Sequence, residues 1–303
     1  MREIAIVGAG KVGTVLGRVL VENGVKVVCV VSRTRKSAVA AGRFLGCRNV
    51  SDSLTAIPSS TNLIYITTPH SAVEEVAREL SRLHHLKFKR LSVCHASGIL
   101  TAKALAPLSR RGATVFSFHP LQTFPRDFKP EDIVPTARGL YYAVDGTAKG
   151  VKVAEQFARR LDGRILRVKP EMRVFYHAAC VVASNHLTAM LSVLETMYGR
   201  LGVREKSFFR VFKPIMMATL LNNERTSPAE ALSGPVARGG VETVAGHLRS
   251  IRKNAPDLLP YFGTLTLETV KLAERKGSIT TDRALAMRRL VRSFSDSQTK
   301  ERR

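Results

Sequence analysis

A glycine-rich turn close to the N-terminus constrains the fold of this chain more than any other feature. Residues 8–13 read GAGKVG. They follow an apolar run at residues 3–8 and open a stretch in which Val12, Val15 and Leu16 recur at helical spacing. A strand, a tight glycine turn and a helix in this order are typical of dinucleotide-binding domains, where amides at the helix start approach a pyrophosphate.

Strand-like and helical patterns alternate through the first half of the chain, as in a parallel sheet with helices on both faces. The predicted strands span residues 3–8, 26–31, 62–67, 90–95, 113–118, 139–144 and 164–168. From about Pro170 the pattern is helical, with long apolar stretches at 174–198, 208–221, 258–276 and 281–294. We therefore predict an α/β fold, with a doubly wound Rossmann domain over residues 1–168 and an all-helical domain over residues 169–303.

Composition is that of an ordinary globular protein, with one unusual property, the charge. Hydrophobic residues make up 45% and charged residues 24% of the chain, which argues against disordered or fibrous classes. The net charge of +24 would attract nucleic acids, acidic membranes or anionic small molecules. The basic residues are spread along the chain, without a nucleic-acid recognition motif or an aromatic-rich basic stripe. We therefore expect an anionic small-molecule substrate, and neither a nucleic acid nor a membrane.

The cellular location and the cysteines give simpler expectations. The uninterrupted apolar runs are short, and the N-terminus leads into a strand pattern rather than a signal peptide. These features predict a cytoplasmic protein. The four cysteines form no C-x-x-C pair, so we expect neither structural disulfides nor a metal site.

The predicted dinucleotide site joins the glycine turn to two strand ends. The first glycine permits the turn, the second the approach of the phosphates, and the third the packing of helix against strand. The second strand ends in Ser32, Arg33 and Thr34 rather than in the carboxylate that holds the ribose of NAD, and these side chains can donate to a 2′-phosphate. The alternative is a solvated helix start. We predict NADP rather than NAD, bound by Gly8, Gly10, Lys11, Val12, Gly13, Ser32, Arg33, Thr34, Thr68 and Pro69.

Polar residues at three strand ends mark the predicted reaction site, because ligands of open parallel sheets lie beyond the carboxyl ends of the strands. The segments read TTPH at 67–70, HASG at 95–98 and HPLQT at 119–123. Ser97, His119 and Gln122 are candidates to bond a substrate oxygen. Alternatively, Ser97 caps the following helix and His119 is a buried histidine satisfied by the backbone.

A polar stripe on the first helix after residue 170 is a second candidate. His177, Ser184 and Thr188 share one face of an apolar helix, with Asn185 beside them. The stripe faces either neighbouring helices or the cofactor cleft, and we favour the cleft. Further along, Arg238 lies in a glycine-rich segment that is either an interhelical turn or an anchor for a carboxylate.

These motifs together resemble a family of Rossmann-like proteins with a C-terminal domain of unknown function numbered 2520. The resemblance rests on GAGKVGTVLG at 8–17, HASG at 95–98, SFHPLQTF at 117–124, HAACVVASNHL at 177–187 and GPVARGG at 234–240. The architecture is also similar to pyrroline-carboxylate reductase, deazaflavin-dependent NADP reductase and prephenate dehydrogenase. The resemblance implies NAD(P) binding, a helical domain like that of 6-phosphogluconate dehydrogenase, and a homodimer formed through it.

The resemblance also bears on single residues. In prephenate dehydrogenases a His-Pro segment and a helix carrying Ser-His help to form the substrate site, and His119 and Ser184 look like the counterparts. Asn185 then stands in place of a catalytic histidine. Two positions depart from the closer family, since His70 and Gly240 stand where that family usually has Asp. The resemblance therefore does not carry catalytic detail over directly.

We predict an NADP(H)-dependent oxidoreductase that transfers a hydride to or from a C=O or C=N carbon of a small, carboxylated metabolite. His119 or His177 is the expected proton donor. The predicted catalytic residues are Ser97, His119, His177, Ser184 and Asn185, and the predicted substrate-binding residues are Gln122 and Arg238. Two alternatives stay open: a non-enzymatic NADP-binding sensor or assembly protein, and a basic nucleic-acid-associated protein.

Overall fold

The computed structural model describes residues 3–301, with side chains described up to residue 294, and it contains two compact units. The units are Met1–Asn185 and His186–Arg303. The boundary between them falls inside one long helix, Pro170–Gly199, and therefore later than the predicted boundary at residue 168. The first turns of that helix belong to the first unit because Arg173 is buried in a polar network there.

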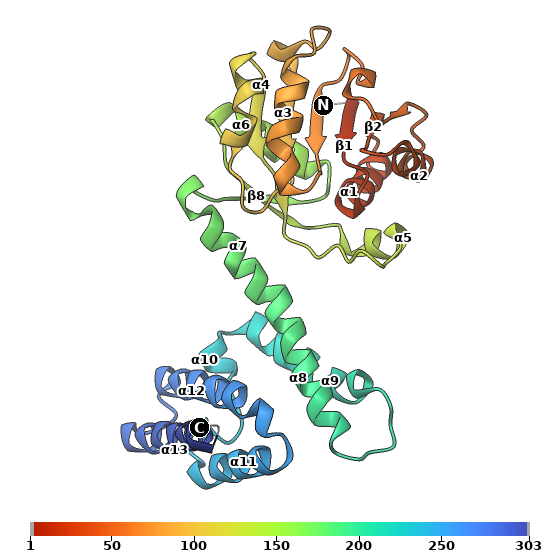
Figure 1. Ribbon diagram of the computed structural model, residues 1–303. Coiled ribbons are helices and arrows are strands. Elements are labelled where there is room, and N and C mark those ends of the chain that lie inside the picture. The colour runs from red at the N-terminus through yellow and green to blue at the C-terminus, as the bar shows by residue number, and fades with distance from the viewer. Residues whose placement is uncertain (1–2, 302–303) are drawn as a thin grey trace. The chain divides into compact units, whose positions relative to one another are not determined.

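A six-stranded parallel sheet forms the centre of the first unit (Figure 1). Its strands are β1 (Glu3–Val7), β2 (Lys26–Val31), β3 (Val50–Ser51), β4 (Leu63–Ile66), β5 (Ser92–His95) and β6 (Thr114–Ser117). Their spatial order is β3-β2-β1-β4-β5-β6, and all neighbouring pairs are parallel. This is the order of a doubly wound Rossmann sheet, with its switch point between β1 and β4. The predicted α/β class is confirmed.

Helices cover both faces of the sheet because successive side chains of a strand point to opposite faces. In β1, Ile4 packs in one apolar cluster with residues of α1, whereas Ala5 packs in another with residues of α3. The helices of this unit are α1 (Lys11–Glu22), α2 (Arg35–Leu45), α3 (Val73–Ser81), α4 (Ala106–Arg110), α5 (Pro130–Ile133), α6 (Ala148–Arg159) and α7 (Arg173–Val181). The alternation in the sequence thus directs α3 and α4 to one face and α1 and α6 to the other.

The last two predicted strands do not belong to the main sheet. They are β8 (Tyr141–Val144) and β9 (Arg164–Arg167), which pair in parallel. With β7 (His119–Pro120), which is antiparallel to β8, they form a separate three-stranded sheet. The strand pattern assigned them to one parallel sheet because periodicity records the two faces of a strand but not the strand with which it pairs.

The second unit is entirely helical in the part that the structure describes, as predicted. Its helices are α8 (Leu187–Gly199), α9 (Phe208–Arg225), α10 (Pro228–Ala231), α11 (Val241–Asn254), α12 (Leu259–Lys276) and α13 (Thr281–Glu301). The core lies between α11, α12 and α13, where Leu248, Val270 and Met287 are fully buried. By contrast, α9 buries none of its residues, and Ile215 is 64% exposed.

The long helix Pro170–Gly199 has the length and hydropathy of a membrane span. Polar residues interrupt its apolar residues, so the short uninterrupted apolar runs of the sequence did not predict a span. One such helix is weak evidence for a membrane protein, since helices of soluble proteins pass the same test. Arg173 in its first turns is 1% exposed and pairs with Asp145. The Arg173 side chain is therefore enclosed by protein, whereas its neighbours Val174 and Phe175 are 68% and 71% exposed.

Candidate functional site

A cleft of about 920 Å³ lies where β1 and β4 end, within the size range of small-molecule sites. The glycine turn, the loop after β4, one face of α2 and the segment between β7 and α5 line it. The lining residues discussed below are Gly10, Lys11, Ser37, Thr68, Arg126 and Glu131. The cleft therefore occupies the switch point of the sheet, as the glycine motif predicts.

The glycines of the turn expose the backbone to the cleft. Gly8 has a φ of +112°, and a Cβ there would lie 2.7 Å from the Thr67 carbonyl carbon, so only glycine fits. Gly10 has nothing within 4 Å of its Cβ position, which leaves room for a ligand. Within the described chain, the first turn of α1 has neither a side-chain cap nor an acidic residue. Its amides are available to an anion.

One side chain in the cleft lacks a partner. Thr68 Oγ1 is buried and has no hydrogen-bond partner among the described residues, although Thr68 lines the cleft. An unsatisfied buried hydroxyl costs about 1–3 kcal/mol, and a polar ligand would remove this cost. Together with the open space at Gly10, it shows that the residues present fit a bound dinucleotide.

Two of the residues predicted at the end of β2, Arg33 and Thr34, differ in their environments. Arg33 is exposed and makes no ion pair with any described residue. The Thr34 hydroxyl caps α2, because its Oγ1 accepts from the Ser37 amide at 3.3 Å and donates to Ser37 Oγ at 2.9 Å. Arg33 therefore keeps a guanidinium available for a phosphate, whereas Thr34 has a structural role. Ser37, which lines the cleft, was not among the predicted residues.

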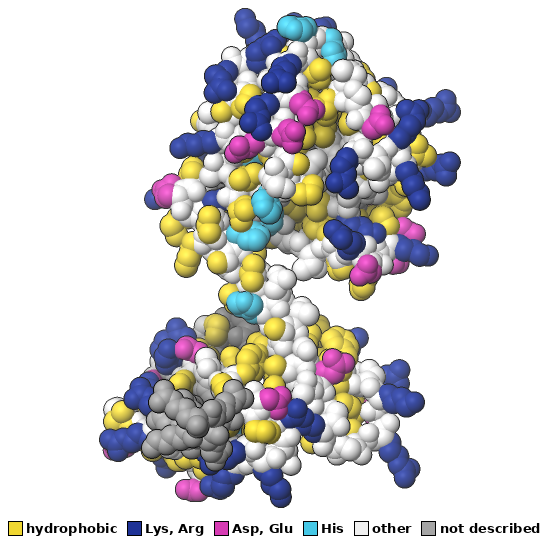
Figure 2. All heavy atoms as spheres, viewed as in Figure 1, with side chains coloured by type: hydrophobic (Ala, Val, Ile, Leu, Met, Phe, Trp, Pro, Cys, Tyr) yellow, Lys and Arg dark blue, Asp and Glu magenta, His cyan; other side chains and the backbone are white. Residues whose placement is uncertain are grey.

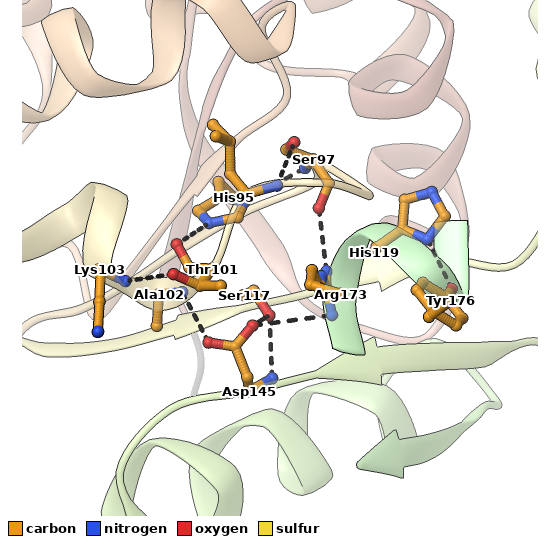
Figure 3. A network of polar contacts seen from close by, with 11 residues as sticks. His95, Ser97, Thr101, Ala102, Lys103, Ser117, His119, Asp145, Arg173 and Tyr176 are labelled. Atoms are coloured by element: carbon orange, nitrogen blue, oxygen red, sulfur yellow. Dashed lines mark hydrogen bonds and ion pairs between the residues drawn. The ribbon is translucent and has the colours of Figure 1, made fainter. Parts of the chain in front are cut away.

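A buried ionic network lies beyond the ends of β5 and β6 (Figure 3). Arg173 Nη2 donates to the Ser97 carbonyl at 3.0 Å, and Nη1 lies 3.8 Å from Asp145 Oδ2. The Asp145 carboxylate accepts from Ser117 Oγ at 2.5 Å and from the Ala102 amide at 2.7 Å. Burial lowers the pKa of Arg173, and the Asp145 charge opposes this shift. The network ties the loop after β5 to the ends of β6 and β8 and to the start of α7.

A histidine–tyrosine pair lies next to this network. His119 Nδ1 and the Tyr176 hydroxyl are 2.8 Å apart, and the His177 ring centroid is 5.9 Å from that of His119. A Cβ on Gly98 would lie 2.3 Å from His177 Cδ2 and 3.0 Å from His119 Nε2, so the loop after β5 packs directly on both rings.

Electrostatics keep both members of the pair neutral. Burial lowers the pKa of His119 from 6.5 to about 3, and the Arg173 charge acts in the same direction. Burial also raises the pKa of Tyr176. A neutral imidazole and a neutral phenol that share a hydrogen bond can pass a proton to an adjacent ligand.

Two family models match the chain. Residues 2–120 match a Rossmann-like domain, and residues 140–269 match a domain of unknown function, DUF2520. The chain therefore contains a Rossmann-like domain followed by a DUF2520 domain. The DUF2520 match begins directly before β8, so it covers β8, β9 and the long helix as well as most of the second unit.

Solved structures share the fold of this DUF2520 protein at low sequence identity. A protein provisionally named an NADP oxidoreductase, from Bacteroides fragilis, has a TM-score of 0.68 and 19% identity, over 89% of this chain and 98% of its own. A reductive aminase from Aspergillus terreus has a TM-score of 0.60 and 16% identity, over 98% of this chain and 94% of its own. A pyrroline-5-carboxylate reductase from Coxiella burnetii has a TM-score of 0.58 and 13% identity, over 95% of this chain and 97% of its own. No curated protein matches the chain.

The predicted residues at the strand ends have different environments. Ser97 Oγ accepts from the Leu100 amide at 3.2 Å, as a cap would. His95 is fully buried between the Thr101 carbonyl and the Ser97 amide, and burial lowers its pKa to about 4, so its role is structural. Gln122 uses its amide within its own loop, where Nε2 donates to the Thr136 carbonyl at 2.6 Å. Of these candidates, His119 is the one that is hydrogen-bonded to a tyrosine hydroxyl and can therefore take part in proton transfer.

The predicted helical stripe is interrupted. A π-helical turn, Val182–His186, follows α7 and contains Ser184 and Asn185. Ser184 Oγ is 2.9 Å from the Cys180 carbonyl and 3.0 Å from Asn185 Oδ1. Single π turns within helices are frequent at functional sites. Thr188 lies beyond the turn and is exposed.

The structure therefore brings Ser97, His119 and His177 together and adds two residues that sequence reasoning missed. These are Arg173 and Tyr176, which precede His177 on the same face of α7 at helical spacing, a signal that was present in the sequence. Arg238 is exposed in a turn of the second unit, where its carbonyl accepts from Arg283 Nη1 at 3.3 Å. Its predicted role as a carboxylate anchor stays a prediction.

Proposed function

We propose that this DUF2520 protein is a soluble, cytoplasmic NADP(H)-dependent oxidoreductase that acts on a C=O or C=N carbon of a small anionic metabolite. The proposal is carried by one arrangement: the cleft follows β1 and β4, and the His119–Tyr176 pair lies by the ends of β5 and β6, at the same edge of the sheet. The structural neighbours support it, since one is named as an NADP oxidoreductase and another was determined with NADPH.

Different residues of the chain would bind the dinucleotide and transfer the proton. Gly10, Lys11 and Thr68 would hold the dinucleotide, which supplies or accepts the hydride when it is bound. Reduction of a C=O or C=N group also consumes one proton. The Tyr176–His119 pair would deliver that proton to the substrate oxygen or nitrogen, and would take it back in the reverse direction.

The buried guanidinium of Arg173 would assist this step. It lies 5.5 Å from the centre of the Tyr176 ring, so its positive charge would stabilise negative charge that develops as the hydroxyl gives up its proton. Ser97, His177, Ser184 and Asn185 would orient the substrate and limit the access of water. Arg173 itself acts through Tyr176 and is a positioning residue.

Three variants test this assignment, once turnover has been found by screening keto acids and cyclic imines with NADPH. We expect all three variants to keep NADPH affinity nearly unchanged. His119→Ala and Tyr176→Phe should lower kcat about 100-fold or more, the scale of lost general acid catalysis. Asn185→Ala should also lower kcat, because the substrate is no longer oriented. Binding is measured by titration and kcat by NADPH absorbance. Exposed residues away from the site, His84→Ala and Tyr141→Phe, serve as controls.

Two results would contradict the proposal. A protein that binds NADPH tightly but turns over no substrate in the screen would favour the sensor or assembly function. Variants that melt at lower temperature but keep the wild-type rate would show that these residues only support the core.

A further inference from the structure

The segment between β7 and β8 forms a closed loop beside the cofactor cleft, here called the strap loop (residues 122–136). The bond from Gln122 Nε2 to the Thr136 carbonyl closes its ends. Phe124 packs against the apolar cluster of α1, and Ile133 in α5 is buried within that cluster. The loop is therefore anchored at its base and at two points along its length, and its exposed residues have a defined place next to α1.

The strap loop and the glycine turn both line the cleft. Phe124, Arg126, Pro130 and Glu131 contribute from the loop, and Gly10 and Lys11 from the turn. The charged lining residues are Lys11, Arg126 and Glu131, two cations against one carboxylate. Among the described residues, Arg126 has no ion-pair partner, so its guanidinium is free to meet an anion in the cleft.

We infer that Arg126 binds the pyrophosphate of the dinucleotide together with the start of α1. The inference rests on the proposed function to the extent that the cleft binds a dinucleotide. The helix start offers neutral amides and Lys11, whereas a guanidinium adds a planar fork that matches phosphate oxygens. Arg126 lines the cleft with Gly10 and Lys11 of the glycine turn and with Ser37 of α2, whereas Arg33 is not among the lining residues. It therefore serves the pyrophosphate, which NADPH and NADH have in common, and not the 2′-phosphate.

Titration of the full-length protein with both cofactors tests this assignment. We expect Arg126→Ala to lower the affinities for NADPH and NADH by the same factor, about five- to tenfold. This is the loss expected for one exposed charged hydrogen bond. The loss should shrink at high salt because the contact is solvent-accessible. Arg126→Lys should recover part of the affinity. Lys129→Ala removes a charge from the same loop at an exposed position outside the cleft lining, and should change neither affinity.

Several results would overturn the assignment. Unchanged affinities in Arg126→Ala, a loss confined to NADPH, or an equal loss in Lys129→Ala would each show that Arg126 does not contact the pyrophosphate. The proposed function fails separately: a wild-type protein that binds neither cofactor removes both proposals, whereas wild-type binding with an unchanged Arg126→Ala variant removes only this one.

Discussion

Arg33 is the residue on which the choice between NADPH and NADH depends. It is exposed at the end of β2, no described residue pairs with it, and no carboxylate stands beside it to hold a ribose hydroxyl. We expect the wild-type protein to prefer NADPH by at least tenfold, the scale of one charged hydrogen bond. Arg33→Ala should abolish that preference and leave NADH affinity unchanged, which titration with both cofactors measures.

The control for this experiment is Arg43→Ala, an exposed arginine further along α2. It should leave the preference intact. Equal affinities of the wild-type protein for NADPH and NADH would remove the argument from the end of β2. Arg126→Ala should weaken the binding of both cofactors, whereas Arg33→Ala should weaken that of NADPH alone. A single set of titrations therefore distinguishes the two arginines.

At the scale of elements, the joint between α7 and the Rossmann sheet depends on the Arg173–Asp145 pair. Both side chains are buried, at 1% and 4% exposure. Removing one partner of a buried pair leaves an uncompensated charge and costs about 3–5 kcal/mol. We expect Arg173→Met and Asp145→Ala each to lower the free energy of unfolding by this amount, measured by urea denaturation.

The double variant distinguishes a coupled pair from two separate packing defects. Arg173→Met with Asp145→Ala should cost clearly less than the sum of the single changes, because neither charge is then left alone. Lys271→Ala breaks the exposed pair with Glu268 and should cost below about 1 kcal/mol. Additive losses in the double variant would show that the two charges do not stabilise each other.

The π-helical turn explains why the predicted stripe of polar residues holds only in part. Offsets of seven and eleven residues return to one face only in an uninterrupted α-helix. A π turn accommodates an extra residue and shifts the face of everything after it. His177 and Ser184 accordingly remain half-buried, whereas Thr188, beyond the turn, is exposed.

At the scale of the whole molecule, α9 leaves an apolar surface exposed. We propose that a second copy of the chain covers it and forms the homodimer implied by the family resemblance. α9 buries none of its residues, and its exposed apolar side chains are Phe209, Val211, Ile215, Met217, Leu220 and Leu221. Apolar side chains in this number on one exposed helix favour a protein partner that covers them.

Light scattering after size exclusion tests the dimer. We expect twice the chain mass of 33.3 kDa, and the monomer mass for Ile215→Glu combined with Leu220→Glu. Leu285→Glu in α13, another exposed leucine, should remain dimeric. A wild-type protein that is monomeric at micromolar concentration would refute the dimer, and recovery only in detergent would favour a membrane role for the long helix.

The basic residues on the visible face of the molecule are spread out and do not form one patch. Figure 2 shows Lys and Arg side chains scattered over the visible face of both units, with Asp and Glu between them. The network of Figure 3 and the cleft both lie in the first unit. The expectation of an anionic small molecule rather than a nucleic acid as partner stays a prediction.

The sequence alone determined the features that depend on neighbouring residues. The spacing of the glycines, the period of the strands and the period of α1 identify the Rossmann domain, the place of the cleft and the helical second half. Each of these signals lies within one element and its adjacent turn. For the same reason, Gly8 and Gly10 were assigned the turn and the open approach that the structure shows.

Only the tertiary structure decided which distant residues meet. Asp145, Arg173 and Tyr176 join Ser97 and His119 because three strand ends and the start of α7 converge there. The pairing of β8 with β7, the closure of the strap loop and the π turn likewise have no local pattern. Hydrophobic period reports which face of an element is buried, but partner choice depends on packing and charge between segments far apart in the chain.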